Sequence, residues 1–284
     1  MKIRRILTHP GGAHKDEFLA CCVLASRNGC EIVRREPGPE DLDDASVAVV
    51  DVGGEHDPAR SNFDHHQFPR DHEPVCALSL VLMDLGIYED AQSFCDWLET
   101  TERFDVTGPN STAKWLGVER EALSRLVSPM DITLLRRFER CSELAGGDPL
   151  YEVMRWVGED LIEFVRSLRA RLEFIGEHAA IWEIEGLKVL FMPRTEPLPA
   201  EASAGLGRYL ESIGLAGEVA GLVYPDRRGS GYGLSRHNDD PRFDFTRLEA
   251  EDDVHFAHVR GFVAKTSAAT AERLLDLLRL AKVD

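Results

Sequence analysis

The 284-residue sequence lacks an apolar segment long enough to cross a membrane as a helix. Its longest apolar runs, residues 46–52 and 187–193, have the length of a β-strand, whereas a transmembrane helix takes about 20 apolar residues. The first residues also lack the charged, apolar and small-residue succession of a signal peptide, because His9 follows a short strand-like start. We therefore expect a cytoplasmic protein with no membrane partner.

The chain is poor in basic residues and has no cysteine motif. Its 33 lysines and arginines stand against 50 aspartates and glutamates, which gives a net charge of -17. This balance argues against a broad nucleic-acid-binding surface, but it is compatible with a phosphate substrate held by metal ions, since metal sites need carboxylates. The six cysteines form no C-x-x-C pair, which disfavours a zinc ribbon or a disulfide framework.

The first part of the chain alternates between strand-like and helical patterns. Residues 2–8, 31–35 and 46–52 are expected to be strands, and residues 16–27 carry apolar side chains at helical spacing. Strands that alternate with helices predict a doubly wound α/β domain with a parallel sheet. Asp51 follows a continuous apolar run, so we expect its side chain to enter a site at the carboxyl edge of that sheet.

The middle of the chain is mostly helical, and a second α/β pattern follows it. The expected helices are residues 76–85, 91–102, 120–126, 132–144 and a long connecting segment at 151–177. Beyond residue 180 we expect strands at 181–184, 188–192, 219–224, 231–237 and 254–263, with helices at 203–213 and 268–280. The predicted organisation is a catalytic domain at 1–145, a connecting helix at 146–180 and a smaller substrate-binding α/β domain at 181–284.

Histidines and aspartates are concentrated near the N-terminus. Three clusters follow expected strand ends or loops: the segment from His9 to Glu17, Asp51, and Asp64-His65-His66. Imidazole and carboxylate together suit Mn, Fe, Zn or Co, whereas an all-oxygen set would suit Mg. His56 and His72 are interpreted as ordinary loop residues. The three clusters together favour a metal site over a set of solvated polar loops.

The DHH motif suggests a division of roles between its two histidines. Adjacent side chains in an extended segment point to opposite sides. We therefore expect one of His65 and His66 to bind metal and the other to face a substrate.

Longer motifs carry a family resemblance. The stretches THPGGAHKDEFLACCVL and VVDVGGEHDPARSNFDHHQ resemble the DHH phosphoesterase superfamily, and within it the melanocyte-proliferating-gene family of metal-dependent hydrolases and exonucleases. The likeness is strong over about the first 70 residues and returns weakly at FAHVRGFVAKTSAATAERLLDLL. It implies a DHH-type catalytic domain, followed by a helical connector and a smaller domain that closes over the metal centre.

The resemblance also implies roles for single residues. The implied metal ligands are His9, His14, Asp16, Asp51, His65 and Asp105. Asp64 would orient His65, and His66 would contact the transferred phosphoryl group. Two alternatives stay open: His14 replaces His9 as a ligand or both bind, and Asp96 is the weaker rival of Asp105. In the smaller domain, the implied substrate-binding residues are Arg236, His237, His258 and Gly261.

The implied chemistry is phosphodiester hydrolysis assisted by two divalent cations. Mn²⁺ is the expected metal, with Mg²⁺, Co²⁺ and Zn²⁺ as alternatives, because a pair of cations can activate water and offset charge on phosphoryl oxygens. The leading hypothesis is a 3′–5′ exonuclease acting on short oligonucleotides or a small phosphate-containing molecule. An inorganic pyrophosphatase or small-nucleotide phosphatase is the second hypothesis, and a non-catalytic metal-binding regulatory module is the third. The sequence leaves a homodimer open.

Overall fold

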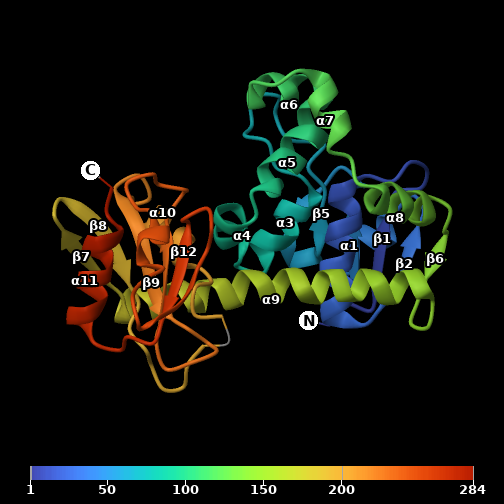
Figure 1. Ribbon diagram of the computed structural model, residues 1–284. Coiled ribbons are helices and arrows are strands. Elements are labelled where there is room, and N and C mark those ends of the chain that lie inside the picture. Colours follow the sequence, from blue (N-terminus) through green and yellow to red (C-terminus); the bar gives the residue numbers. More distant parts are fainter. Residues whose placement is uncertain (1, 200, 284) are drawn as a thin grey trace. The chain divides into compact units, whose positions relative to one another are not determined.

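The computed structural model describes residues 2–199 and 201–283, which fall into two compact units. The first unit ends at Ser167 and the second begins at Leu168, so the division lies within the long helix α9, Pro149–His178 (Figure 1). The division into domains predicted from the sequence remains a proposal. No helix among the described residues combines the length and the apolarity that a membrane span needs.

The first unit is built on a mixed sheet with the strand order β4-β5-β3-β1-β2-β6. Its strands are β1 Arg5–Thr8, β2 Glu31–Arg34, β3 Val47–Val50, β4 His56–Asp57, β5 Asn62–Phe63 and β6 Glu143–Leu144. The four central strands β5, β3, β1 and β2 are parallel, which confirms the parallel-sheet α/β prediction, and the edge strands β4 and β6 are antiparallel. All four residues of β3 are buried, as expected of a central parallel strand.

Helices and short loops complete the first unit. These helices are α1 Lys15–Asn28, α2 Pro39–Asp43, α3 Ala77–Asp84, α4 Tyr88–Phe94, α5 Trp97–Thr107, α6 Pro109–Leu116, α7 Arg120–Arg125, α8 Pro129–Glu139 and the first part of α9. A short 3₁₀ turn covers Pro58–Arg60. Helix α1 packs on α3 and α8, where Phe18 meets Phe138 edge to face at 5.4 Å between ring centroids. The helix expected at 132–144 begins earlier, at Pro129, and ends earlier, at Glu139, because the chain turns into β6.

The second unit has its own sheet and core. The strand order is β11-β12-β10-β9-β8-β7, and only the β8–β9 pair is parallel among the described residues of this second sheet. The strands are β7 Ala180–Ile184, β8 Leu187–Phe191, β9 Val219–Pro225, β10 Tyr232–Arg236, β11 Val254–Ala257 and β12 Val263–Thr266, and they are accompanied by α10 Leu206–Ser212, α11 Ala271–Ala281 and a 3₁₀ turn at Phe245–Leu248.

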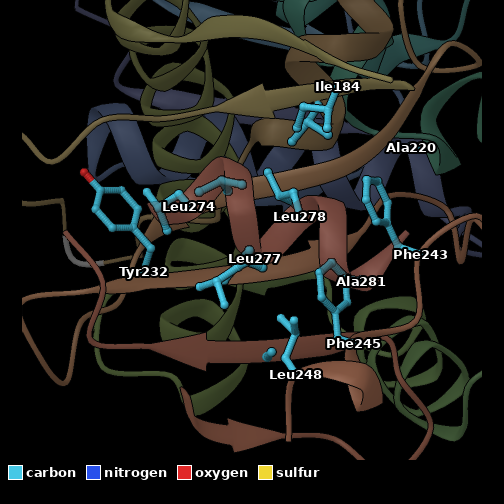
Figure 2. Packing of buried hydrophobic residues seen from close by; sticks show 14 of the residues in the cluster. Ile184, Ala220, Tyr232, Phe243, Phe245, Leu248, Leu274, Leu277, Leu278 and Ala281 are labelled. Atoms are coloured by element: carbon cyan, nitrogen blue, oxygen red, sulfur yellow. The ribbon is translucent and has the colours of Figure 1, made fainter. Parts of the chain in front are cut away.

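Figure 2 shows how α11 closes the core of the second unit. Leu274, Leu277 and Leu278 lie on one face of this helix and are fully buried with Phe243 and Phe245. Their spacing of three and four residues is the helical period that the sequence displays. Removing such apolar area from water is the main favourable contribution to folding of this unit.

The sequence prediction of one strand at 254–263 is wrong. The segment forms the hairpin of β11 and β12, and the intervening turn is closed by the Gly261 amide, which donates to the His258 carbonyl at 2.7 Å. Gly261 has φ +67°, a conformation that a side chain disfavours. Gly261, which interrupts the apolar run, was therefore the sequence signal for a turn between two strands.

Candidate metal centre

The N-terminal clusters meet at the carboxyl edge of the parallel strands. Strands β5, β3 and β1 are neighbours, and each is followed at once by part of a cluster: Asp64-His65-His66, Asp51 and His9, respectively. Helix α1 begins at the same edge and contributes Asp16 from its first turn. Parallel strands end on one side of a sheet, so residues far apart in sequence are brought together there.

Asp51, His65, Asp16 and Asp105 form the most compact group of potential ligands. Each offers one atom, and these atoms lie within 4.8 Å of one another. His65 Nε2 is 3.0 Å from Asp51 Oδ1 and 3.0 Å from Asp105 Oδ2. Asp105 is provided by α5, whereas Asp96 belongs to none of the groups of this kind found in the described part of the chain.

The backbone at Asp51 is unusual. Its φ of 59° lies in the left-handed region, and its amide donates to the Phe63 carbonyl at 3.0 Å. Such a conformation costs about 1–3 kcal/mol for a residue other than glycine and is concentrated at functional sites. The turn directs the Asp51 carboxylate toward the loops instead of continuing β3.

His9 and His14 both approach the group. His9 Nε2 contacts Glu17 and lies 3.5 Å from Asp51 Oδ2, while His14 Nδ1 lies 3.7 Å from Asp105 Oδ1. The two imidazoles and Asp51 can together provide a second set of ligands. His9 is mostly enclosed, whereas the His14 side chain is 60% exposed. The arrangement keeps both histidines as candidate ligands.

Asp64 contacts a different histidine from the expected one. Its Oδ1 accepts hydrogen bonds from the His66 amide at 3.0 Å and from His66 Nδ1 at 2.7 Å, and its Oδ2 accepts from the Gly54 amide at 2.6 Å. Asp64 therefore orients the exposed His66, while His65 is held by Asp51 and Asp105.

The two adjacent histidines do not point to opposite sides. The ring centroids of His65 and His66 are 4.5 Å apart, and His66 Nδ1 is 3.8 Å from Asp51 Oδ1. The prediction assumed an extended segment, but β5 ends at Phe63 and the chain turns at His66. His65 is nonetheless buried and His66 exposed, so their surroundings differ as a ligand and a substrate-facing residue would require.

The sequence analysis missed a buried ion pair next to the centre. Glu17, fully buried in α1, accepts from Arg34 Nη2 at 3.1 Å and also from the Thr8 hydroxyl. Arg34 also donates to the Phe138 carbonyl at 3.0 Å. The available signals were only an acidic residue in the first helical turn and an arginine at a strand end, which are common in solvated positions.

The charges of the centre strongly perturb one another. Hydrogen bonds to Asp51 and Glu17 raise the pKa of His9 to about 10. Burial lowers the pKa of His65, but hydrogen bonds to Asp105 and Asp51 outweigh it and raise this pKa to about 10. Burial likewise opposes ionisation of Asp51, yet its contacts with His65 and His9 lower its pKa to about 2. At neutral pH, protons on two imidazoles therefore offset carboxylate charge.

Asp16 shows why a divalent cation fits this arrangement. Its side chain is buried, and Oδ1 has no hydrogen-bond partner among the described residues. Burial and the nearby charges of Asp51 and Asp105 raise its pKa. A buried oxygen without a donor, facing two further carboxylates and an imidazole, has the chemistry of a ligand for a borderline or hard metal ion.

An open pocket adjoins the metal-ligand candidates. It has a volume of about 360 Å³, and its lining includes His9, His14, Asp51, Asp64 and His66. His66 and His14 are its most exposed histidines. The pocket offers the proposed ligands to a molecule arriving from solvent.

The four substrate-binding candidates of the second unit lie at two places: Arg236 and His237 at the end of β10, and His258 and Gly261 in the turn between β11 and β12. Arg236 Nε donates to the Phe243 carbonyl at 2.6 Å. Gly261 leaves no room for a side chain, because a Cβ would meet Asp244 Oδ1 at 2.1 Å. His258 Nδ1 accepts from the Arg260 amide.

His237 differs from the other three candidates. It is 6% exposed, and its Nε2 has no partner among the described residues. Burial lowers its pKa, which favours the neutral imidazole. The substrate-binding role of all four residues remains a proposal.

Comparison with known proteins locates the strongest similarity in the segment that builds the centre. Residues 5–75 match the sequence model MYG1_exonuc, described as an uncharacterised protein family, UPF0160. This segment is similar to the MYG1 family. The human and bovine proteins called MYG1 exonuclease are each 50% identical to this chain over 66 residues, and the rat protein is 48% identical. The resemblance seen in the two N-terminal motifs is thereby confirmed.

The likeness to MYG1 proteins is local. The matched 66 residues make up 22% of this chain and 17% of the human protein. Two solved structures match along 98% of the chain at 13% identity: a DHH-domain protein described as a member of a family of ribosomal proteins, with a TM-score of 0.33, and a pGpG-specific phosphodiesterase from Vibrio cholerae, with a TM-score of 0.31. The matches cover 86% of the chain of the DHH-domain protein and 99% of the chain of the phosphodiesterase.

Proposed function

We propose that this protein is a metal-dependent phosphodiesterase that removes nucleotides from the 3′ end of short oligonucleotides. The observation that carries the proposal is the convergence of Asp16, Asp51, His65 and Asp105 within 4.8 Å, largely from the segment that is similar to MYG1 exonucleases. Four ligand atoms of this kind at the carboxyl edge of a parallel sheet match the chemistry of a divalent-metal hydrolase.

The residues divide naturally between two cations. Asp16, Asp105 and His65 would hold one, His9 and His14 would serve the other, and Asp51 has an oxygen toward each set. Mn²⁺ is the proposed metal. When bound, such cations supply polarisation of phosphoryl oxygens and an activated water.

His66 is the residue proposed to contact the phosphoryl group. It is exposed in the pocket, and Asp64 fixes its ring by accepting the Nδ1 hydrogen bond, so Nε2 is the nitrogen left for a substrate oxygen. A donor at this place can stabilise charge that develops on a non-bridging oxygen.

The test is hydrolysis of short RNA and DNA oligomers labelled at the 5′ end, with Mn²⁺ added to metal-stripped protein. A 3′–5′ exonuclease produces a ladder of labelled products that shorten from the 3′ end. Asp51→Asn and His65→Ala should each reduce the rate roughly a hundred-fold or more. His72→Ala is the matched control, because His72 is exposed and its side chain hydrogen-bonds only its neighbour's carbonyl among the described residues.

Several outcomes contradict the proposal. Faster turnover of pyrophosphate than of a dinucleotide would favour the phosphatase alternative. Bound metal by elemental analysis, with no product from any phosphodiester under Mn²⁺, Mg²⁺, Co²⁺ or Zn²⁺, would favour the non-catalytic module. Internal cleavage of a circular oligonucleotide would reject an exonuclease, since a circle has no 3′ end.

A further inference from the structure

A second pocket of the first unit lies outside the metal-ligand groups. Its volume is about 930 Å³, and it is formed by the end of α8, by β6 and by the start of α9, which lie at one end of the unit (Figure 1). Three arginines, Arg136, Arg137 and Arg140, are part of its lining. Neither an ion pair nor a side-chain hydrogen bond is found for any of them within residues 2–199 and 201–283.

The three arginines are exposed, so their guanidinium groups are open to a molecule from solvent. The one acidic residue in the lining, Asp148, accepts a hydrogen bond from the Ala145 amide at 2.9 Å. The pocket therefore presents a net positive charge on a protein whose net charge is -17.

The remaining lining is apolar. Leu134, Leu144, Leu150 and Val153 contribute side chains, and Leu144 is buried. The first turn of α9, with Pro149 and Leu150, also reaches the pocket, and a helix N-terminus favours an anion. The dipole of α8 accounts for cations at its carboxyl end, but it does not account for an apolar floor beside them.

The pocket is held in a defined position. The Phe138 carbonyl near the end of α8 accepts from buried Arg34, and the Arg34 guanidinium lies 4.5 Å from the Phe138 ring centroid. On the far side, the Tyr151 hydroxyl of α9 donates to the Cys30 carbonyl at 2.8 Å. Both helices that carry the lining are thus fixed to the sheet.

We propose that this pocket binds a nucleotide unit, with the base on the apolar floor and the phosphate among Arg136, Arg137 and Arg140. Guanidinium groups recognise phosphate through paired hydrogen bonds and also stack on planar rings. The same chemistry serves a free mononucleotide or a nucleotide within an oligomer. This binding is independent of the proposed hydrolysis, since it involves none of the metal-ligand candidates.

Cys141 provides a local readout. It lines the pocket and is the one partly exposed cysteine in the described part of the chain, whereas the others are buried. The rate at which iodoacetamide alkylates Cys141 is measured in EDTA, so that no turnover occurs, with increasing 5′-AMP or a short oligonucleotide. We expect at least one of these two nucleotide sources to slow alkylation, and adenosine and inorganic phosphate to protect at least about ten-fold less effectively.

Matched variants make the experiment decisive. The triple variant R136Q/R137Q/R140Q should weaken protection by roughly ten-fold or more, since charge-assisted hydrogen bonds are lost. The control R27Q/K114Q/R125Q removes the same charge from exposed positions outside this pocket and should leave protection unchanged. Thermal unfolding of both triple variants tests whether they are folded.

The proposal is overturned if neither AMP nor an oligonucleotide protects Cys141, or if both triple variants are protected equally. Protection by inorganic phosphate equal to that by AMP would reject the nucleotide assignment. Comparison of the two nucleotide sources distinguishes them. If the site binds free nucleotides, AMP alone protects Cys141; if it binds an oligomer, the longer ligand protects Cys141 more strongly. Loss of hydrolysis in the metal-centre variants leaves all these outcomes unaffected.

Discussion

Glu17 and Arg34 form an ion pair that is almost completely shielded from solvent, with Arg34 Nη2 3.1 Å from Glu17 Oε1. The pair joins the first turn of α1 to the end of β2, directly beside His9. Because Arg34 also bonds the Phe138 carbonyl, one side chain connects the metal-centre helix, the sheet and α8. It therefore supports the geometry of the centre without belonging to the proposed ligands.

Arg34→Ala should lower the free energy of unfolding by about 3–5 kcal/mol, because it leaves the Glu17 carboxylate buried without its partner. Urea denaturation measures this loss. Arg4→Ala is the comparison: it breaks an exposed pair with Asp44 and should cost less than about 1 kcal/mol. The double variant R34M/E17Q should recover part of the loss. Equal effects of Arg34→Ala and Arg4→Ala would contradict the buried role.

Asp16→Asn should stabilise the metal-free protein and weaken metal binding. The buried Asp16 carboxylate lies near Asp51 and Asp105, and one oxygen lacks a donor among the described residues, so a neutral amide relieves repulsion. We expect a gain of about 1 kcal/mol in EDTA. Titration calorimetry with Mn²⁺ should show affinity reduced at least roughly ten-fold. Lower stability in EDTA together with unchanged metal affinity would show that Asp16 is a structural residue only.

Metal binding should release protons. His9 and His65 have pKa values of about 10 in the metal-free protein, so both are protonated at pH 7.5, whereas ligation requires the neutral ring. Calorimetry in buffers of different ionisation enthalpy measures the number released, which should fall as pH approaches 10. The same measurement on His65→Ala should show fewer protons. Proton-independent binding at pH 7.5 would contradict ligation by these imidazoles.

The raised pKa values of His9 and His65 also predict how the stability of the metal-free protein changes with pH. A folded-state pKa above the unfolded value of 6.5 means that protonation stabilises the fold; this contribution is complete below pH 6.5 and is lost as pH rises through about 10. Melting temperature in EDTA should therefore decline over this window. Saturating Mn²⁺ should reduce the decline, since the metal replaces the protons.

The sequence was most informative where patterns are local. The apolar run before Asp51 predicted a buried parallel strand, and the spacing of Phe18, Leu19, Val23 and Leu24 predicted α1, because burial imposes a period on neighbouring residues. The long DHH-containing motifs gave the family resemblance. These signals were enough to predict the α/β fold and to select histidines and aspartates that lie close together in the structure.

Interactions between distant residues could not be predicted in the same way. Nothing near Glu17 indicates that Arg34 will be its partner, and nothing near Asp64 indicates that it binds His66 instead of orienting His65. The turn after β5 decides the latter, and its shape depends on the pairing of β5 with β3 and β4. Helix α6 was not predicted either. It begins at Pro109 directly after Gly108, and a proline at the first helical position is a weak signal when no Ser, Thr, Asp or Asn precedes it.

Gly158 should be the least replaceable glycine of α9. A Cβ at this position would lie 2.1 Å from the Cys22 carbonyl oxygen of α1, so Gly158→Ala forces the two helices apart. We expect a loss of at least about 2 kcal/mol, measured by urea denaturation. Gly176→Ala in the same helix is the matched control, because its Cβ would meet Tyr209 at an ordinary 3.5 Å. Alanine favours the helix there by up to about 1 kcal/mol. Helix propensity alone would make both substitutions favourable. Equal stability of Gly158→Ala and Gly176→Ala would therefore contradict the close contact at Gly158.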